Sequence, residues 1–318
     1  MDFPIIIASL TIFLAGAIAW WTIPRVVEVV NRRNLFDAPD GDRKLHTQPT
    51  PVMGGVGIFL GFIVVLVAAA ELLDIQLDNF FRLSIIGLLF VGIYDDLLNV
   101  SARCKLMVQI AAACLVLYES AGWISHFNGV FGIQSVPLWL AIPLSAFVIV
   151  LIINAYNMID GVDGLAGSQG AIASLLFGTF FYVNGDIELS LISFALTGAL
   201  GGFLLHNRPP ARIFMGDTGS LVVGFVLGFL AVEFVAKLAI SPVLALNDYT
   251  PVLVVAILIV PLYDILRVVS SASAADARRS VPVATTSTTY CKITISGRAA
   301  FRPTWPPCSS WCSWPPTP

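Results

Sequence analysis

Five aspartates lie in three short polar stretches, each next to a long apolar run. They are Asp95 and Asp96 in "GIYDDLLN", Asp160 and Asp163 in "NMIDGVDG", and Asp217 in "IFMGDTGS". Carboxylates that are adjacent, or three residues apart on a helix, repel each other unless a proton or a cation lies between them. Mg²⁺ suits such sites because it binds oxygen ligands and leaves positions for substrate phosphates. Any one of these acids could simply solvate a helix end, but the five together predict a metal and phosphate site.

Glycine, amide and basic residues surround these acids. The glycines of "DGVDGLAG" and "MGDTGS" let the backbone approach a ligand closely, and a helix beginning near Leu165 offers its N-terminus to an anion. Asn154 and Asn157 share a helical face with Asp160, so all three are expected to point to one place. Positive charge is expected from basic residues that, taken singly, also fit the role of membrane anchors: Lys44, Arg103, Lys105, Arg208 and Arg212.

The segments that must position these residues are strongly apolar. Of 318 residues, 57% are hydrophobic and 12% charged, and the mean hydropathy is +0.87, outside the range of soluble globular domains. Nine apolar segments, most near the length that crosses a bilayer as a helix, lie at 4–23, 53–73, 80–94, 105–119, 137–153, 165–183, 188–205, 219–237 and 250–269. The first is expected to be a span and not a cleavable signal, because its start "MDFP" carries an acid and no base. The sequence predicts an all-α polytopic membrane protein with nine transmembrane helices and no nucleic-acid partner.

The basic residues predict the orientation of these spans. If the N-terminus lies outside, the loops at 24–50, 95–105, 154–164 and 206–218 are cytoplasmic and hold nine basic residues, against two in the opposite loops. Cytoplasmic loops carry an excess of Lys and Arg. All five aspartates then lie at the cytoplasmic ends of their spans, where ionisable groups near membrane depth mark a functional site.

Four strings, in this order, resemble the motifs of the polyprenyl-phosphate N-acetylhexosamine-1-phosphate transferase family, glycosyltransferase family 4. The strings are "RKLHTQPTPVMGGVGIF", "GIYDDLLNVSARCKLMVQ", "NAYNMIDGVDGLAG" and "HNRPPARIFMGDTGSLVVGF". Four linked motifs are specific where "DD" or "DG" alone would be weak. The third string is more similar to the UDP-N-acetylglucosamine branch than to the phospho-N-acetylmuramoyl-pentapeptide transferases.

The resemblance implies an activity, partners and a location. It implies transfer of N-acetylhexosamine 1-phosphate, most closely GlcNAc 1-phosphate, from a UDP-sugar to undecaprenyl phosphate with release of UMP, which starts a cell-envelope polysaccharide. It implies Mg²⁺, with Mn²⁺ as an alternative, and a place in the bacterial inner membrane with the active site facing the cytoplasm. Transfer of phospho-N-acetylmuramoyl-pentapeptide is an alternative activity. A secondary transporter is an alternative of another class, although a transporter would place its acids near the membrane midplane and often show an internal repeat. The hexosamine epimer, the downstream polymer and the oligomeric state, a homodimer included, stay open too.

The family's site residues carry over position by position. The resemblance implies that Asp217 binds the metal, that the catalytic residues are Asp95, Asp96, Asp160 and Asp163, and that the substrate-binding residues are Lys44, His46, Lys105, Asn154, Asn157 and Asn207. A phosphate needs no strong base near pH 7, so positioning and charge control are the expected role of Asp95.

The resemblance ends near residue 269. The family continues with an H-x-H-H loop and a last apolar span, whereas residues 270–318 contain no leucine and seven of the 19 prolines. If Ala284 to Lys292 is encoded GCG ACC ACC TCC ACC ACC TAC TGC AAG, reading from the third base gives "DHLHHLLQ". We therefore expect a membrane transferase domain at 1–269 and an out-of-frame segment at 270–318 that has replaced a further helix. With the histidine loop and this helix missing, the chain as given is expected to turn over little or not at all. A genuine Pro/Ser/Thr-rich disordered tail is the alternative.

Overall fold

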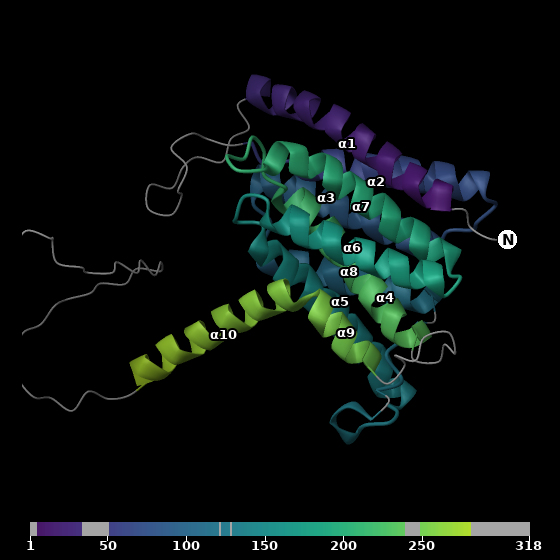
Figure 1. Ribbon diagram of the computed structural model, residues 1–318. Helices are drawn as coiled ribbons and strands as arrows, with labels where there is room; N and C mark the ends of the chain where they lie inside the picture. Colours follow the sequence, from purple (N-terminus) through teal and green to yellow (C-terminus); the bar gives the residue numbers. More distant parts are fainter. Residues whose placement is uncertain (1–4, 34–50, 121, 128, 239–248, 281–318) are drawn as a thin grey trace, which may run out of the picture.

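The structure is a computed structural model that describes residues 5–33, 51–120, 122–127, 129–238 and 249–280. In these ranges the chain forms helices and no β-strand (Figure 1). The elements are α1 (Ile5–Arg33), α2 (Gly54–Leu72), α3 (Asn79–Leu98), α4 (Ala102–Ser120), the 3₁₀ helix η1 (Val130–Gly132), α5 (Leu138–Ile159), α6 (Leu165–Val183), α7 (Ile187–Asn207), α8 (Gly216–Leu238), α9 (Thr250–Ile257) and α10 (Ile259–Ser280). The prediction of an all-α protein is confirmed.

Helix α8 is the centre of the bundle. It packs against α2, α3, α4, α5, α6, α7 and α9, and 94% of its apolar 18-residue stretch is buried. A helix that is apolar on all sides must be covered by other elements or by lipid, and "SLVVGFVLGFLAV" has this character. Phe81 of α3 packs on Phe225 and Phe229 of α8. α1 lies on the outside, against α2 and α7 (Figure 1).

The outer surface of the bundle is apolar. Large side chains such as Phe13, Phe90, Trp139 and Phe147 are exposed. A soluble protein rarely exposes so much apolar surface, whereas lipid solvates it without cost. Six described helices are long and apolar enough to cross a membrane: α1, α2, α5, α6, α7 and α8. The chain is therefore a multi-pass membrane protein.

All nine predicted segments form helices, but not all of these helices are both long enough and apolar enough to cross a membrane. α3 and α4 have the length of a span, 20 and 19 residues, yet fall outside the set of six. α3 carries Arg82 and the two adjacent aspartates Asp95 and Asp96, while α4 carries Arg103, Lys105 and Glu119. These are the helices that bring charge to the site.

The ninth predicted segment, 250–269, is bent. α9 and α10 meet at Leu258 at an angle of 74°, so together they make at most one broken span, the seventh in the described residues. α10 then leads away from the bundle (Figure 1) and continues to Ser280, past the predicted boundary at 269. Residues 281–318 lie outside the described residues, so the frameshift remains a prediction.

The segment before α8 is held by the start of α2. Gly54 N donates to Phe214 O at 2.9 Å, Gly55 N donates to Met215 O at 2.9 Å, and Phe214 N donates to Pro51 O at 2.9 Å. The first amides of a helix have no partner within it, so these carbonyls satisfy α2 while the backbone next to Asp217 is held in place.

Candidate active site

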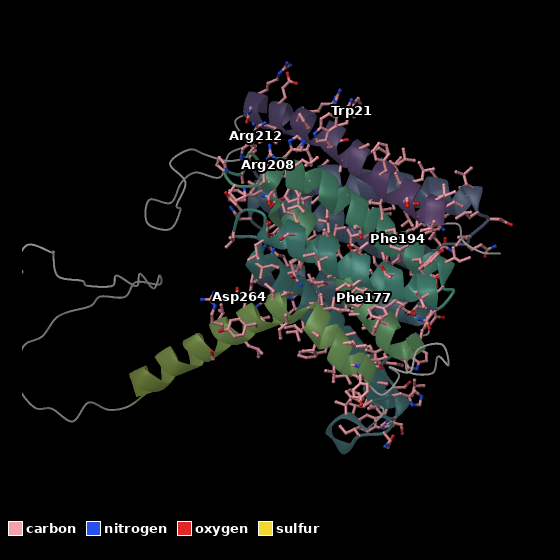
Figure 2. The ribbon with its side chains drawn as sticks, viewed as in Figure 1. Trp21, Phe177, Phe194, Arg208, Arg212 and Asp264 are labelled. Carbon is pink, nitrogen blue, oxygen red and sulfur yellow. The ribbon has the colours of Figure 1, made fainter. Side chains whose placement is uncertain are left out.

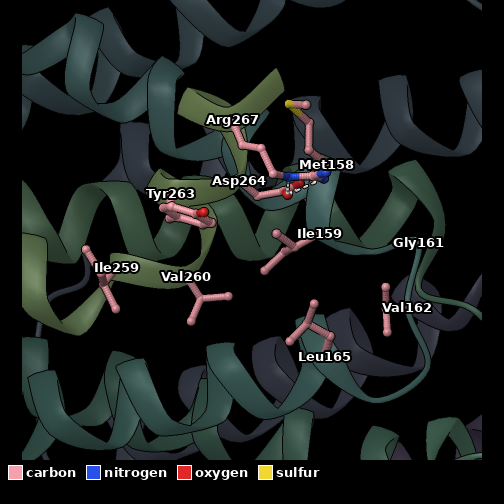
Figure 3. Close-up of a pocket in the computed structure, with 10 residues that line it drawn as sticks. All are labelled: Met158, Ile159, Gly161, Val162, Leu165, Ile259, Val260, Tyr263, Asp264 and Arg267. Carbon is pink, nitrogen blue, oxygen red and sulfur yellow. Dashed lines mark hydrogen bonds and ion pairs between the residues drawn. The ribbon is translucent and has the colours of Figure 1, made fainter. Parts of the chain in front are cut away.

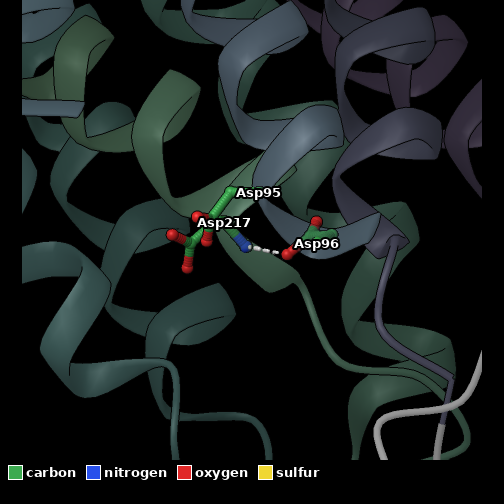
Figure 4. A group of neighbouring side chains, drawn as sticks. All are labelled: Asp95, Asp96 and Asp217. Atoms are coloured by element: carbon green, nitrogen blue, oxygen red, sulfur yellow. Dashed lines mark hydrogen bonds between the residues drawn. The ribbon is translucent and has the colours of Figure 1, made fainter. Parts of the chain in front are cut away.

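Helix ends from four parts of the chain meet at one end of the bundle. They are the C-terminal ends of α3 and α5 and the N-terminal ends of α4 and α8. Asp95 and Asp96 end α3, and Asp217 begins α8 (Figure 4). Each of these three aspartates offers one carboxylate oxygen, and the three oxygens lie within 4.8 Å of one another. The predicted convergence of these acids is therefore present in the fold.

Lys105 of α4 lies between two of the carboxylates. Its Nζ is 2.6 Å from Asp95 Oδ2 and 2.5 Å from Asp217 Oδ2. Asp95 Oδ1 also accepts a hydrogen bond from Val100 N at 2.7 Å. The ammonium group compensates the repulsion that the two acids would otherwise feel. All three side chains are partly exposed, so they can still reach a ligand.

Amide and hydroxyl groups complete the site. Asn157 Nδ2 donates to Asp217 Oδ1 at 2.8 Å and to Ser220 Oγ at 2.7 Å. Asn154 Nδ2 donates to Gln109 Oε1 at 2.8 Å. Gln109 and Ser220, both buried, were not predicted. Helical spacing was the available signal, because Gln109 follows Lys105 by four residues and Ser220 follows Asp217 by three.

These side chains border a small polar cavity between α4, α5 and α8. Its volume is about 200 Å³. The lining consists of Val100, Ala102, Lys105, Leu106, Gln109, Asn154, Asn157, Asp217 and Leu221. Pockets for whole drug-sized ligands run from about 300 to 1,000 Å³, so this cavity matches a phosphate-sized group.

Asp160, Asp163 and Asn207 connect two loops and do not line this cavity. Asp160 Oδ2 accepts from Gly216 N at 3.0 Å, and Asp163 Oδ2 accepts from Ala211 N at 3.0 Å. Asn207 is buried; its Oδ1 accepts from Gly164 N at 2.9 Å and its Nδ2 donates to Ile213 O at 2.8 Å. These three side chains hold the loop after α5 against the segment that leads into α8.

Burial dominates the electrostatics of Asp160. It raises the pKa of this carboxyl to about 8, with a smaller contribution from the nearby Asp96 and Asp217 charges, although the Gly216 amide opposes the shift. Asp160 therefore holds a proton at neutral pH when no cation is near.

Basic residues lie around the same end of the bundle. Arg208 and Arg212 are exposed on the loop between α7 and α8 (Figure 2), and Arg103 is exposed at the start of α4. Lys44 and His46, which the sequence placed at the substrate, lie outside the described residues. Of the basic residues predicted near the site, Lys105 contacts the carboxylates and the three arginines are exposed.

A second pocket borders the site where α10 meets α5. Its volume is about 410 Å³ and its walls are mostly apolar (Figure 3). The lining consists of Met158, Ile159, Gly161, Val162, Leu165, Ile259, Val260, Tyr263, Asp264 and Arg267. At its polar edge Arg267 forms an ion pair with Asp264, with Nη2 to Oδ1 at 2.6 Å. Met158 and Ile159 immediately precede Asp160, so the apolar pocket begins next to the polar site.

Several known proteins have sequences similar to that of this chain. A family model described as glycosyl transferase family 4 matches residues 80–235. A probable undecaprenyl-phosphate N-acetylglucosaminyl 1-phosphate transferase of Bacillus subtilis is 31% identical over 76% of this chain and 65% of its own length. A decaprenyl-phosphate N-acetylglucosaminephosphotransferase of Mycolicibacterium smegmatis is 32% identical over 71% of this chain and 61% of its own. A phospho-N-acetylmuramoyl-pentapeptide-transferase of Synechococcus is 33% identical over 69% and 64%.

The chain thus spans somewhat less than two thirds of the length of these relatives. The matched part contains α3 to α8, which include the three clustered aspartates, Lys105 and Asn157. The residues of the site and these similarities relate residues 80–235 of this chain to glycosyl transferase family 4.

Proposed function

We propose that this protein transfers N-acetylglucosamine 1-phosphate from its UDP-sugar to undecaprenyl phosphate and releases UMP. The observation that carries the proposal is the convergence of Lys105, Asn157 and Asp217 on one cavity at the end of an apolar bundle, with Asp95 paired to Lys105. A polar site at a membrane surface suits a reaction between a water-soluble and a lipid-borne phosphate. The names of the relatives from Bacillus subtilis and Mycolicibacterium smegmatis support this choice of substrates.

In the proposed reaction an oxygen of the lipid phosphate attacks the sugar-bearing phosphorus of the UDP-sugar. A new P–O bond joins lipid phosphate to sugar phosphate, the P–O bond to UMP breaks, and UMP leaves with the bridging oxygen. Lys105 counters the charge of the phosphates, Asp95 orients the Lys105 ammonium, and Asn157 holds the Asp217 carboxylate. Such reactions depend mainly on positioning and on electrostatic stabilisation.

The donor set fits Mg²⁺, with Mn²⁺ as an alternative. Carboxylate oxygens are the ligands that these hard cations prefer, and Asp95 and Asp217 each offer one, with an oxygen of Asp96 within 4.8 Å of both. When bound, the cation would neutralise charge on the diphosphate and on the departing UMP. Asp217, which faces the cavity, is the residue proposed to hold it, with Asp95 beside it.

The remaining predicted roles follow from this site. The apolar pocket between α5 and α10 fits the first isoprene units of the lipid, whose phosphate would then lie near the polar site. The excess of basic residues in the loops at this end supports a cytoplasmic orientation in the bacterial inner membrane. The segment 270–318 remains proposed as out-of-frame; resequencing the end of the gene should reveal a discrepancy of one or two nucleotides near codon 270, and an in-frame gene with a fully active product would contradict this.

The transfer itself is tested with purified protein in vesicles that contain undecaprenyl phosphate. Radiolabelled UDP-GlcNAc, UDP-GalNAc and UDP-MurNAc-pentapeptide are supplied in parallel, with and without a chelator. We expect a cation-dependent lipid-linked product from UDP-GlcNAc, with little turnover by the chain as given and more once the reading frame after codon 270 is restored. Product from UDP-MurNAc-pentapeptide alone would favour the activity named for the Synechococcus relative. Uptake of label without a lipid-linked product would indicate a transporter.

A further inference from the structure

The two adjacent aspartates of α3 point in different directions. Successive residues of a helix are rotated by about 100°, so Asp95 and Asp96 cannot share a face. Asp95 contacts Lys105, which lines the cavity, at 2.6 Å. Asp96 lies four residues after Gly92, on the face of α3 that packs against α8.

The contact between α3 and α8 is close at this point. A Cβ on Gly92 would lie 2.5 Å from Thr218 Cα, so only glycine permits the approach. Gly216, just before Asp217, has φ of 73°, and a Cβ there would lie 2.7 Å from Asp96 Oδ2. The backbone of α8 therefore comes directly against the Asp96 carboxylate.

Asp96 uses both oxygens to cap α8. Its Oδ1 accepts from Asp217 N at 2.9 Å (Figure 4). Its Oδ2 accepts from Thr218 N at 3.0 Å and from Thr218 Oγ1 at 2.5 Å. The first amides of a helix lack partners within it, and a carboxylate there is also favoured by the helix dipole. The residue whose amide is held, Asp217, is the proposed metal ligand.

We propose that Asp96 is a positioning residue, which caps α8 and thereby orients Asp217, and that it contacts neither substrate nor metal. The inference rests on the proposed function for the role of Asp217. The two adjacent acids then have different roles. Asp95 pairs with Lys105, whereas Asp96 accepts hydrogen bonds from the backbone of α8. Thr218, which is fully buried, belongs to the same cap because its hydroxyl donates to Asp96.

Thr218 supplies the test because it touches Asp96 but is shielded from any ligand. Thr218→Val keeps the shape and removes the hydroxyl donor, Thr218→Ser restores it, and Thr197→Val removes a hydroxyl from α7 away from the site as a matched control. The readouts are Mg²⁺ affinity, followed by thermal shift in a Mg²⁺ titration without substrate, and the kcat and KM of transfer. Thr218→Ala replaces the valine variant if that protein elutes as an aggregate.

We expect Thr218→Val to weaken Mg²⁺ binding about tenfold and to lower kcat with little change in KM, as loss of a capping bond implies. Thr218→Ser should return toward the wild-type values, and Asp96→Asn combined with Thr218→Val should be no worse than Asp96→Asn alone. Wild-type Mg²⁺ affinity in Thr218→Val, or effects that multiply in the double variant, would overturn the positioning role. Weakened Mg²⁺ binding in a protein whose wild type makes no lipid-linked product would instead reject the proposed function and keep the cap.

Discussion

Helix α8 meets a lysine and carboxylates at both of its ends, but the two groups are built differently. At the N-terminal end, Asp217 is paired with Lys105 from α4 at 2.5 Å. At the C-terminal end, Lys237 lies 3.6 Å from Glu233 on the same helix and 2.8 Å from Asp186, the residue that caps α7. The first group connects helices around a cavity, and the second ties α8 to the start of α7.

The surroundings of the two carboxylates differ further. Asp217 accepts hydrogen bonds from Lys105 and Asn157, and 21% of its side chain is exposed. Glu233 is 1% exposed, and neither of its oxygens has a hydrogen-bond partner among the described residues. A ligand can reach the first carboxylate but not the second. An acid beside a lysine therefore does not by itself mark a reactive site. What distinguishes the reactive site is that a ligand can reach its carboxylate and that several helices supply hydrogen-bond partners to it.

Replacing the carboxylate at each end of α8 should give the largest difference in transfer rate between the two ends. Asp217→Asn keeps the volume but removes the charge, so we expect Mg²⁺ affinity to collapse and the transfer rate to fall about 10³-fold, the scale of losing a key electrostatic group. Glu233→Gln is the matched control and should leave the rate within about twofold. The measurement is transfer to undecaprenyl phosphate at saturating Mg²⁺. Equal losses in both variants would show that the two ends do not differ as described.

Replacing the lysine at each end of α8 should give a smaller difference in transfer rate between the two ends. Lys105→Met removes the cation between Asp95 and Asp217, and we expect about a 10²-fold loss of rate with a raised KM for the UDP-sugar. Lys237→Met should change thermal stability more than rate, since Asp186 and Glu233 lose their shared partner. Steady-state kinetics and a melting curve on each variant decide the matter; a Lys105→Met enzyme with the wild-type rate would remove this lysine from the site.

Asp160, which lies near the N-terminal end of α8, should contribute to the pH dependence of stability. The pKa of Asp160 is raised to about 8 in the folded protein, against about 3.9 when unfolded, so the folded state binds more protons between these values. Stability should therefore fall as pH rises from 4 toward 8, by at most about 1.4 kcal/mol per pH unit. Melting temperatures in chelator-containing buffers across this range test the sign. Asp160→Asn should flatten the curve; an unchanged slope would assign the effect to another group.

The smallest effect is expected from neutralising Glu233 itself. A buried carboxylate without hydrogen-bond donors is costly, and Lys237 keeps Asp186 as its closer partner. Glu233→Gln should therefore leave the protein equally stable or more stable, by about 1 kcal/mol at most. Thermal unfolding in detergent at pH 7 measures this change. A clear loss of stability would mean that the Glu233 charge holds the C-terminal end of α8 together.

Local properties of the sequence determined the class of the protein and the residues of its site. Runs of apolar residues near the length of a bilayer span are visible without a structure, because the cost of placing polar groups in lipid acts segment by segment. The polar residues at the ends of these runs could be identified in the same way, so Asp95, Lys105, Asn157 and Asp217 were predicted and do meet.

Only the tertiary structure decided what each polar side chain contacts. Asp95 and Asp96 are equivalent in the sequence, yet one faces Lys105 and the other caps α8, because the close packing of Gly92 on Thr218 sets the rotation of α3. The bend at Leu258 likewise depends on how α9 and α10 pack. An apolar run specifies that a helix forms, whereas its rotation is set by neighbours far away in the chain, and at about 100° per residue that rotation decides whether an aspartate reaches a substrate or a backbone amide.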